Sequence, residues 1–318
     1  MNLQTLPTTR NNANALDAAH VLLQDLIDYA GLFPPASLCM APAVTNYAAY
    51  SRSEWSWILG RFIVPVARLG EFEEALAALP NPASGAGSAI WRLSVLPGSD
   101  VALDVARIRE FNARIASSGS GKRAVVESVE VKIRSAEEIR RLSTIIPADT
   151  VTYFEIPLSS CADCIAAVAE CGRRAKIRMG GETADKFPAS ARVIEFIREC
   201  ASAKVPFKAT AGLHHPLRSV HRFTYQPESA SGVMHGFLNL FLAAAFLRAG
   251  MKDEIAIELL EEQAPEAFHF DLDGYGIAWR QHRLVRDEIA AARRDFAISF
   301  GSCSFTEPID DLRALHLL

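Results

Sequence analysis

The sequence predicts an α/β protein, a closed (β/α)8 (TIM) barrel that forms a single domain over residues 1–318. Short runs of β-prone residues alternate with amphipathic helical patterns along the whole chain, which is typical of βαβ units and a parallel sheet. The runs number eight, the count that closes such a barrel. No GxGxxG follows the first run, as would be expected in a doubly wound dinucleotide-binding sheet.

The eight expected strands are rich in Val, Ile and Phe, and they cover 26–32, 61–66, 90–96, 124–133, 151–158, 175–180, 206–213 and 296–301. Helical patterns lie before the first strand and after the second to sixth strands, at 15–25, 68–79, 100–117, 135–144, 161–172 and 188–203. A short final helix is expected near 307–315. The stretch 80–88, PNPASGAGS, is predicted to be a flexible loop because Gly, Pro and Ser dominate it.

A long helical insertion, 214–295, is expected between the seventh and eighth strands. It consists of a loop at 214–232 and helices at 235–249, 252–263 and 280–294. The insertion begins at the carboxyl end of a strand, where the active sites of barrel enzymes lie. A lid over the site and a contact in a homo-oligomer, through the apolar helix 235–249, are both open interpretations.

Composition excludes several classes of protein. A net charge of −4 gives no basic field for nucleic acid. The polar start, MNLQTLPTTRNNANA, lacks the apolar run of a signal peptide, and the most apolar stretch, 236–247, is too short to span a bilayer. We therefore expect a cytoplasmic protein that contacts neither nucleic acid nor membrane.

No metal or other cofactor is expected. Cys161 and Cys164 form a C-x-x-C with Cys171 nearby, but a fourth ligand is missing, so the spacing is taken as one face of a helix with reduced thiols. His214, His215, His221 and His235 do not form the spacings HxH or HxxxH. These spacings leave open a metal near His214, His215 or His235.

Charged side chains are predicted inside the barrel. Side chains alternate along a strand, and the outward set should be apolar because it packs under the helices. On four consecutive strands the other set is charged, and it comprises Glu130, Lys132, Glu155, Lys176, Arg178 and Lys208. A structural barrel interior is filled with Val, Ile and Leu. A buried ion-pair network is the alternative, but we favour an active site, and its excess of cations predicts a small anionic substrate, a carboxylate or phosphate ester.

Polar groups at the ends of these strands are the expected substrate-binding residues. Gly180 and Gly181 follow the sixth strand and would let backbone amides approach a ligand. Ser302 follows the eighth strand before a short helix, a common place for phosphate in barrels. Lys132, Arg178, Thr210 and His215 complete the set, and His214 is a candidate for proton transfer.

The segments K-I-R-M-G (176–180) and K-A-T-A-G (208–212) place a lysine on each of two consecutive strands, with a glycine four residues later. This pattern resembles the sixth and seventh strands of the deoxyribose-phosphate aldolase family, which are class I aldolases on a (β/α)8 barrel. The resemblance implies that Lys176 forms a Schiff base with a carbonyl substrate and that Lys208 lies beside it. The whole chain also resembles a group of uncharacterised bacterial proteins that share KATAGLHHP (208–216), which implies no activity.

The leading functional hypothesis is therefore a lysine-dependent lyase or aldolase-like enzyme, with Lys176, Lys208, Glu155, Glu130 and His214 as catalytic residues. For Lys176 to become a neutral nucleophile, we expect Glu130 and Glu155 to pair with Lys132 and Arg178 instead. Two alternatives remain. The lysines could only bind an anion in a cofactor-free or metal-assisted enzyme, or the barrel could bind a metabolite without catalysis.

Overall fold

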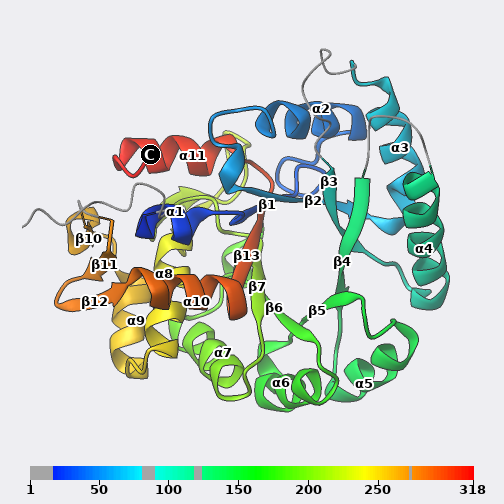
Figure 1. The fold of residues 1–318 in the computed structure, drawn as a ribbon. Helices are drawn as coiled ribbons and strands as arrows, with labels where there is room; N and C mark the ends of the chain where they lie inside the picture. Colours follow the sequence, from blue (N-terminus) through cyan, green and yellow to red (C-terminus); the bar gives the residue numbers. More distant parts are fainter. Residues whose placement is uncertain (1–16, 81–89, 118–123, 272–273) are drawn as a thin grey trace, which may run out of the picture.

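Eight parallel strands close into a barrel in the computed structural model, which describes residues 17–80, 90–117, 124–271 and 274–318 (Figure 1). The strands adjoin in the order β1-β13-β7-β6-β5-β4-β3-β2, so the last barrel strand closes onto the first. Their bounds are Ile27–Tyr29 (β1), Leu59–Pro65 (β2), Trp91–Leu96 (β3), Ala124–Lys132 (β4), Val151–Glu155 (β5), Arg174–Arg178 (β6), Phe207–Thr210 (β7) and Ala297–Ser302 (β13). Each lies within or close to an expected range, so the closed (β/α)8 barrel is confirmed.

Helices surround the barrel (Figure 1). They are Ala18–Leu23 (α1), Met40–Tyr50 (α2), Leu69–Ala78 (α3), Val101–Ser117 (α4), Ala136–Ile145 (α5), Cys161–Glu170 (α6), Ser190–Ser202 (α7) and Thr306–Ala314 (α11). Helix α2 was not among the expected elements, although Met40, Ala43, Val44 and Tyr47 follow the helical spacing and are buried. The expected loop 80–88 lies almost wholly outside the described residues.

The segment between β7 and β13 is not purely helical. It holds the helices Phe237–Arg248 (α8), Asp253–Glu261 (α9) and Arg286–Asp295 (α10). It also holds two small antiparallel sheets, formed by Ser219–Arg222 (β8), Ser231–Met234 (β9), Phe268–Phe270 (β10), Gly276–Trp279 (β11) and His282–Val285 (β12). The expected helix 280–294 therefore starts later, because its first residues form β12.

Helix α8 is an internal element. Residues 237–247 are all buried within this one chain, and the helix packs against α7, α9, α10 and β13. A helix that is apolar on all sides belongs in a protein core. The structure therefore gives no support to an oligomer contact through 235–249, since the apolar residues 237–247 are already covered within this chain.

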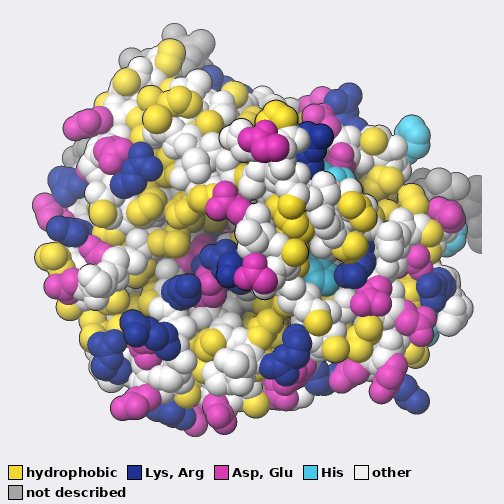
Figure 2. Space-filling model, turned by 180° about the vertical axis from the view of Figure 1, so that it is seen from behind, with side chains coloured by type: hydrophobic (Ala, Val, Ile, Leu, Met, Phe, Trp, Pro, Cys, Tyr) yellow, Lys and Arg dark blue, Asp and Glu magenta, His cyan; other side chains and the backbone are white. Residues whose placement is uncertain are grey.

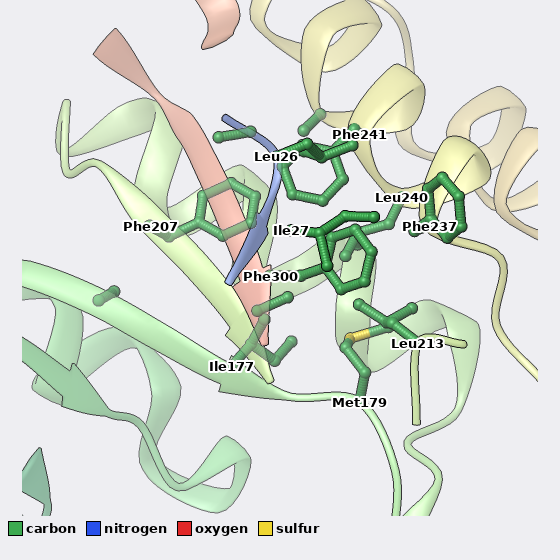
Figure 3. Close-up of a cluster of buried hydrophobic side chains, with 14 of the residues drawn as sticks. Leu26, Ile27, Ile177, Met179, Phe207, Leu213, Phe237, Leu240, Phe241 and Phe300 are labelled. Carbon is green, nitrogen blue, oxygen red and sulfur yellow. The ribbon is translucent and has the colours of Figure 1, made fainter. Parts of the chain in front are cut away.

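The outward faces of the strands make the core beneath these helices (Figure 3). Phe300 of β13 stacks on Phe237 of α8 with ring centroids 5.0 Å apart, and Phe207 of β7 meets Phe196 of α7 edge-on. Burial of each such ring contributes about 1.5–3 kcal/mol. Because these positions face outward, the intervening residues of the same strands face the barrel interior.

None of the helices in the described part of the chain is long and apolar enough to cross a membrane.

Candidate functional site

Five charged side chains from five strands meet inside the barrel. Asp28, Glu130, Glu155, Lys176 and Lys208 are each at most 8% exposed. The register of the sheet brings several of them together, because Glu155 lies beside Lys176, and Lys176 beside Lys208, on neighbouring strands. Glu130 and Glu155 lie in the carboxyl-terminal halves of their strands, toward the end where barrel active sites are found, and Asp28, Lys176 and Lys208 lie at or before the middle of theirs. The face shown in Figure 2 is hollowed near its centre, where acidic and basic side chains gather.

Lys208 is enclosed by two carboxylates. Its Nζ lies 2.6 Å from Oδ2 of Asp28 and 2.5 Å from Oε1 of Glu130, and it lies 5.6 Å from the centroid of the Tyr153 ring. Asp28 also accepts hydrogen bonds from Oγ of Ser299 and from the backbone N of Arg61, both at 2.7 Å. Lys208 is therefore a fixed positive charge at the centre of the network.

Lys176 lies between the carboxylates of Glu130 and Glu155. Its Nζ is 3.0 Å from Oε2 of Glu130 and 2.9 Å from Oε2 of Glu155. We expected Glu130 and Glu155 to pair with Lys132 and Arg178 rather than with Lys176. This expectation is wrong for Glu130, and Glu155 pairs with both Arg178 and Lys176. Glu155 contacts Lys176 through one oxygen and accepts a hydrogen bond from Nε of Arg178 at 3.1 Å through the other. Glu130 bridges the two lysines.

Two serines extend the network from the side of β3 and β4. Ser94 donates a hydrogen bond to Oε1 of Glu130 at 2.6 Å, and Ser128 donates to the Ser94 hydroxyl at 2.8 Å. Both serines are buried. Every buried oxygen of Glu130 thus has a donor, as a stable buried carboxylate requires.

The charges balance. The three carboxylates of Asp28, Glu130 and Glu155 face the cations of Lys176, Lys208 and Arg178. Burial alone would raise the pKa of Glu130, but Lys208 and Lys176 hold it far below its ordinary value. Burial opposes Lys176 and Arg178 in the same way at Glu155, and the net result is again a lowered pKa. Both groups are therefore ionised carboxylates at neutral pH. Burial would lower the pKa of Lys208, but Asp28 and Glu130 raise it above the ordinary value.

The excess of cations expected from the sequence is not found in the buried cluster. Asp28 supplies an acid that the sequence analysis missed, and Lys132, although beside Glu155 in the register, is exposed at the end of β4. Arg178 stands at the end of β6 with 48% of its side chain exposed. Lys132 and Arg178 are thus the basic groups that an incoming ligand can reach.

The two glycine-containing turns have structural roles. A Cβ on Gly180 would lie 2.8 Å from Cα of Gly212 and 2.5 Å from the Phe187 ring, so the turns after β6 and β7 can approach only through glycine. Gly181 adjoins Lys186. The Ser302 hydroxyl accepts a hydrogen bond from the Ser304 amide. The sheet register pairs Ser302 with Tyr29 and not with Asp28, whose side chain faces inward. Ser302 is therefore not brought into the cluster.

Thr210 and the histidines lie beyond the cluster. Thr210 ends β7 beside Arg178. His214 contacts Glu307 at 3.1 Å and His215 contacts Asp311 at 2.6 Å, so both rings face α11. The chain turns just before them, at Ala211 and Gly212, which both have positive φ. His214 is thus held toward α11 by its own carboxylate partner.

No group of three or more His, Cys, Asp or Glu within the described ranges is arranged to hold a metal ion. None of the six cysteines forms a disulfide, and Cys161 and Cys164 are buried on one face of α6.

Comparisons of the chain with protein families, with curated proteins and with solved structures gave no match.

Proposed function

We propose that the chain is a lysine-dependent enzyme in which Lys176 forms a Schiff base with a small carbonyl compound. One observation carries the proposal: Nζ of Lys176 lies within 3.0 Å of two buried carboxylates, Glu130 and Glu155. Each carboxylate is in turn oriented by another cation, Lys208 or Arg178. A nucleophile within hydrogen-bond reach of a base, with the base held by a third group, is the arrangement that activates side chains for covalent catalysis.

The chemistry uses these groups in a defined order. The Lys176 ammonium gives a proton to Glu155 or Glu130, and the freed nitrogen lone pair attacks the carbonyl carbon. The carbonyl oxygen takes up a proton to give a carbinolamine. The same carboxylates then move the protons that let this hydroxyl leave as water, which leaves a protonated imine on Lys176. The net change joins an ammonium and a carbonyl into an iminium and one water.

Lys208 has a positioning role in this scheme. It fixes Glu130 beside Lys176 through an ion pair of 2.5 Å and keeps a positive charge close to the reacting nitrogen. The resemblance of 176–213 to the deoxyribose-phosphate aldolase family supports the same assignment, with Lys176 as the Schiff-base lysine and Lys208 as its neighbour. Aldol cleavage or addition is the reaction class that this resemblance suggests.

The substrate class follows from the groups at the mouth. Arg178 and Lys132 are accessible cations beside the buried cluster, and a guanidinium binds carboxylate or phosphate oxygens well. A small carbonyl compound that carries such an anionic group would place its anion on Arg178 and its carbonyl carbon toward Lys176.

Reductive trapping tests the proposal. The protein is incubated with acetaldehyde, pyruvate and glyceraldehyde 3-phosphate in turn, then reduced with borohydride, and its intact mass is measured. We expect one adduct for each chain of the wild-type protein and none for Lys176→Met. Lys186→Met, which removes an exposed lysine that among the described residues pairs with Asp185, is the control and should give the same adduct as the wild type. Wild-type protein that gains no adduct, or Lys176→Met that gains the same adduct, would overturn the proposal.

A second candidate function rests on the exposure of Arg178. If the lysines serve only as fixed charges, the barrel binds an anion without covalent chemistry. In that case phosphate or pyruvate binds to the wild type, fails to bind to Arg178→Gln, and leaves no trapped adduct.

A further inference from the structure

A second pocket lies outside the charged cluster, beside the turns that follow β6 and β7. It has a volume of about 400 Å³, within the range of small-molecule sites. Its walls come from the turn before α7, the β8–β9 hairpin and the end of α9, and its main lining side chains are Phe187, Ser190, Arg218, Phe223, His235 and Glu261. The Phe187 ring also packs over Gly180 and Gly212, so it separates this pocket from the barrel mouth.

Arg218 brings a positive charge to this pocket, held by neutral groups. One guanidinium nitrogen lies 3.4 Å from the Ser190 hydroxyl and 3.3 Å from Nδ1 of His235. Nε2 of His235 donates to the carbonyl of Pro188 at 2.8 Å, which leaves Nδ1 as an acceptor. Ser190 and His235 are only 5% and 3% exposed. Arg218 forms no ion pair with any residue of the described ranges.

Glu261 brings a negative charge to the same pocket. It is the last residue of α9, and it is exposed. With the residues that the structure describes it forms no ion pair, and it does not pair with Arg218. The pocket thus carries one cation and one anion that do not neutralise each other.

A buried amide fixes both charged walls. Asn239 is the single polar residue in the apolar run 237–247 of α8, and it is fully buried. Its Oδ1 accepts from the backbone N of Arg218 at 3.0 Å. Its Nδ2 donates to the carbonyls of Leu259 and Glu262, both at 2.9 Å, on either side of Glu261. The backbone segments that carry Arg218 and Glu261 are therefore tied to one side chain.

The remaining wall is aromatic. The rings of Phe187 and Phe223 lie with centroids 5.0 Å apart, and both line the pocket. Flat apolar rings bind an apolar or aromatic group by burial of its surface.

We propose that this pocket binds a small zwitterion, an amino-acid-like molecule with its carboxylate on Arg218, its ammonium on Glu261 and its apolar side chain against Phe187 and Phe223. The site goes beyond the proposed function and does not use Lys176. A phosphate or a simple carboxylate would satisfy Arg218 but would leave Glu261 without a partner and facing a like charge.

Calorimetric titration of the full chain tests the proposal with three matched probes. Phenylalanine carries both charges, 3-phenylpropionate lacks the ammonium, and phenethylamine lacks the carboxylate. Inorganic phosphate is the fourth probe. We expect phenylalanine to bind at least about tenfold more tightly than the other three, because each lost charge leaves a protein charge unpaired. Leucine should also bind, since the aromatic wall accepts any apolar side chain.

Substitutions in and outside the pocket show whether phenylalanine binds there. Arg218→Gln and Glu261→Gln should each weaken phenylalanine binding by about tenfold or more. Arg218→Lys should keep part of the binding if the charge rather than the fold is responsible. Arg222→Gln on the same hairpin and Glu254→Gln on the same helix, both exposed and outside the pocket lining, are controls that should bind normally. Lys176→Met should also bind normally, which separates this test from that of the proposed function.

Any of three results would overturn the proposal. The first is the absence of phenylalanine and leucine binding to a folded wild-type protein at millimolar concentrations. The second is binding that Arg218→Gln and Glu261→Gln leave unchanged, and the third is binding of phosphate or 3-phenylpropionate as tight as that of phenylalanine.

Discussion

At the scale of single residues, the cluster depends on Lys208 more than on any other cation. It is 1% exposed and contacts both Asp28 and Glu130, so its removal leaves two buried carboxylates without their partner. We expect Lys208→Met to lower the free energy of unfolding by about 3–5 kcal/mol. Urea denaturation measures this change.

The control and a partial rescue sharpen that prediction. Lys186→Met removes an exposed pair with Asp185 and should cost less than about 1 kcal/mol. Adding Asp28→Asn to Lys208→Met should recover part of the loss, because one of the unpaired charges is then gone. A loss in Lys208→Met no larger than that in Lys186→Met would show that the network does not hold the fold.

The absence of a side chain at Gly60 leaves room for the carboxylate of Asp28. A Cβ at position 60 would lie 2.4 Å from Oδ1 of Asp28, the oxygen that accepts from the Arg61 amide. We expect Gly60→Ala to destabilise the protein by about 1–3 kcal/mol through this overlap. Gly70→Ala is the matched control, since no atom lies within 4 Å of its Cβ position and alanine favours the helix α3. Thermal unfolding of both variants checks the pair, and equal melting temperatures would contradict the account of Gly60.

At the scale of elements, Asn239 joins α8 to its neighbours. Its side-chain amide forms hydrogen bonds with backbone groups of Arg218, Leu259 and Glu262. Asn239→Leu therefore leaves one buried backbone donor and two carbonyls without this partner. We expect a loss of about 1–3 kcal/mol in the free energy of unfolding. Leu242→Met on the same buried helix conserves volume and should cost less than about 1.5 kcal/mol. If denaturant titration gives both variants the stability of the wild type, Asn239 does not tie these elements together.

The elements that could be predicted from the sequence are those with a clear period. All eight barrel strands were expected because runs of β-prone residues alternate with helical patterns, and the inward Glu130, Lys176 and Lys208 followed from the alternation of side chains within their own strands. Asp28 was missed because β1 has only three residues, all of them buried, so no alternation is visible. The hairpin β8–β9 was missed because each of its strands has only four residues, and Val220 and Val233 are open to solvent. Its position could come only from tertiary contacts.

The pairing of each charged side chain with its partner could not be predicted from the sequence. The alternation places Glu130, Glu155 and Lys176 in the same interior, but it cannot say which carboxylate meets which cation. The sheet register decides that, since it sets Lys176 beside both Glu155 and Lys208. Lys132 shares the expected parity yet is exposed, because β4 ends there.

At the scale of the whole molecule, the cluster makes stability depend on pH in a defined direction. The pKa values of Glu130 and Glu155 are lower in the folded state than their ordinary values. Their contribution is therefore fully present above the unfolded pKa of about 4.3 and is lost as the pH falls toward the folded values. The pKa of Lys208 is raised, so its contribution is present below about pH 10.4 and is lost only as the pH rises through the higher folded value.

Urea denaturation measures the free energy of unfolding at each pH. We expect the contribution of these groups to stay constant from neutral pH down to about pH 5, and the free energy of unfolding to fall below about pH 4. Glu155→Gln should show a shallower acid loss than the wild type. Stability that rises on acidification through this range, in the wild type, would contradict the assignment of Glu130 and Glu155 as ionised partners of the lysines.

The position of the borohydride-trapped adduct shows whether Lys176 is the lysine that forms the imine. Peptide mass spectrometry after reduction locates the modified residue. We expect the adduct on Lys176 in the wild type, although Lys176 is far less exposed than Lys132 or Lys186. An adduct spread over exposed lysines, or one that remains in Lys176→Met, would contradict it.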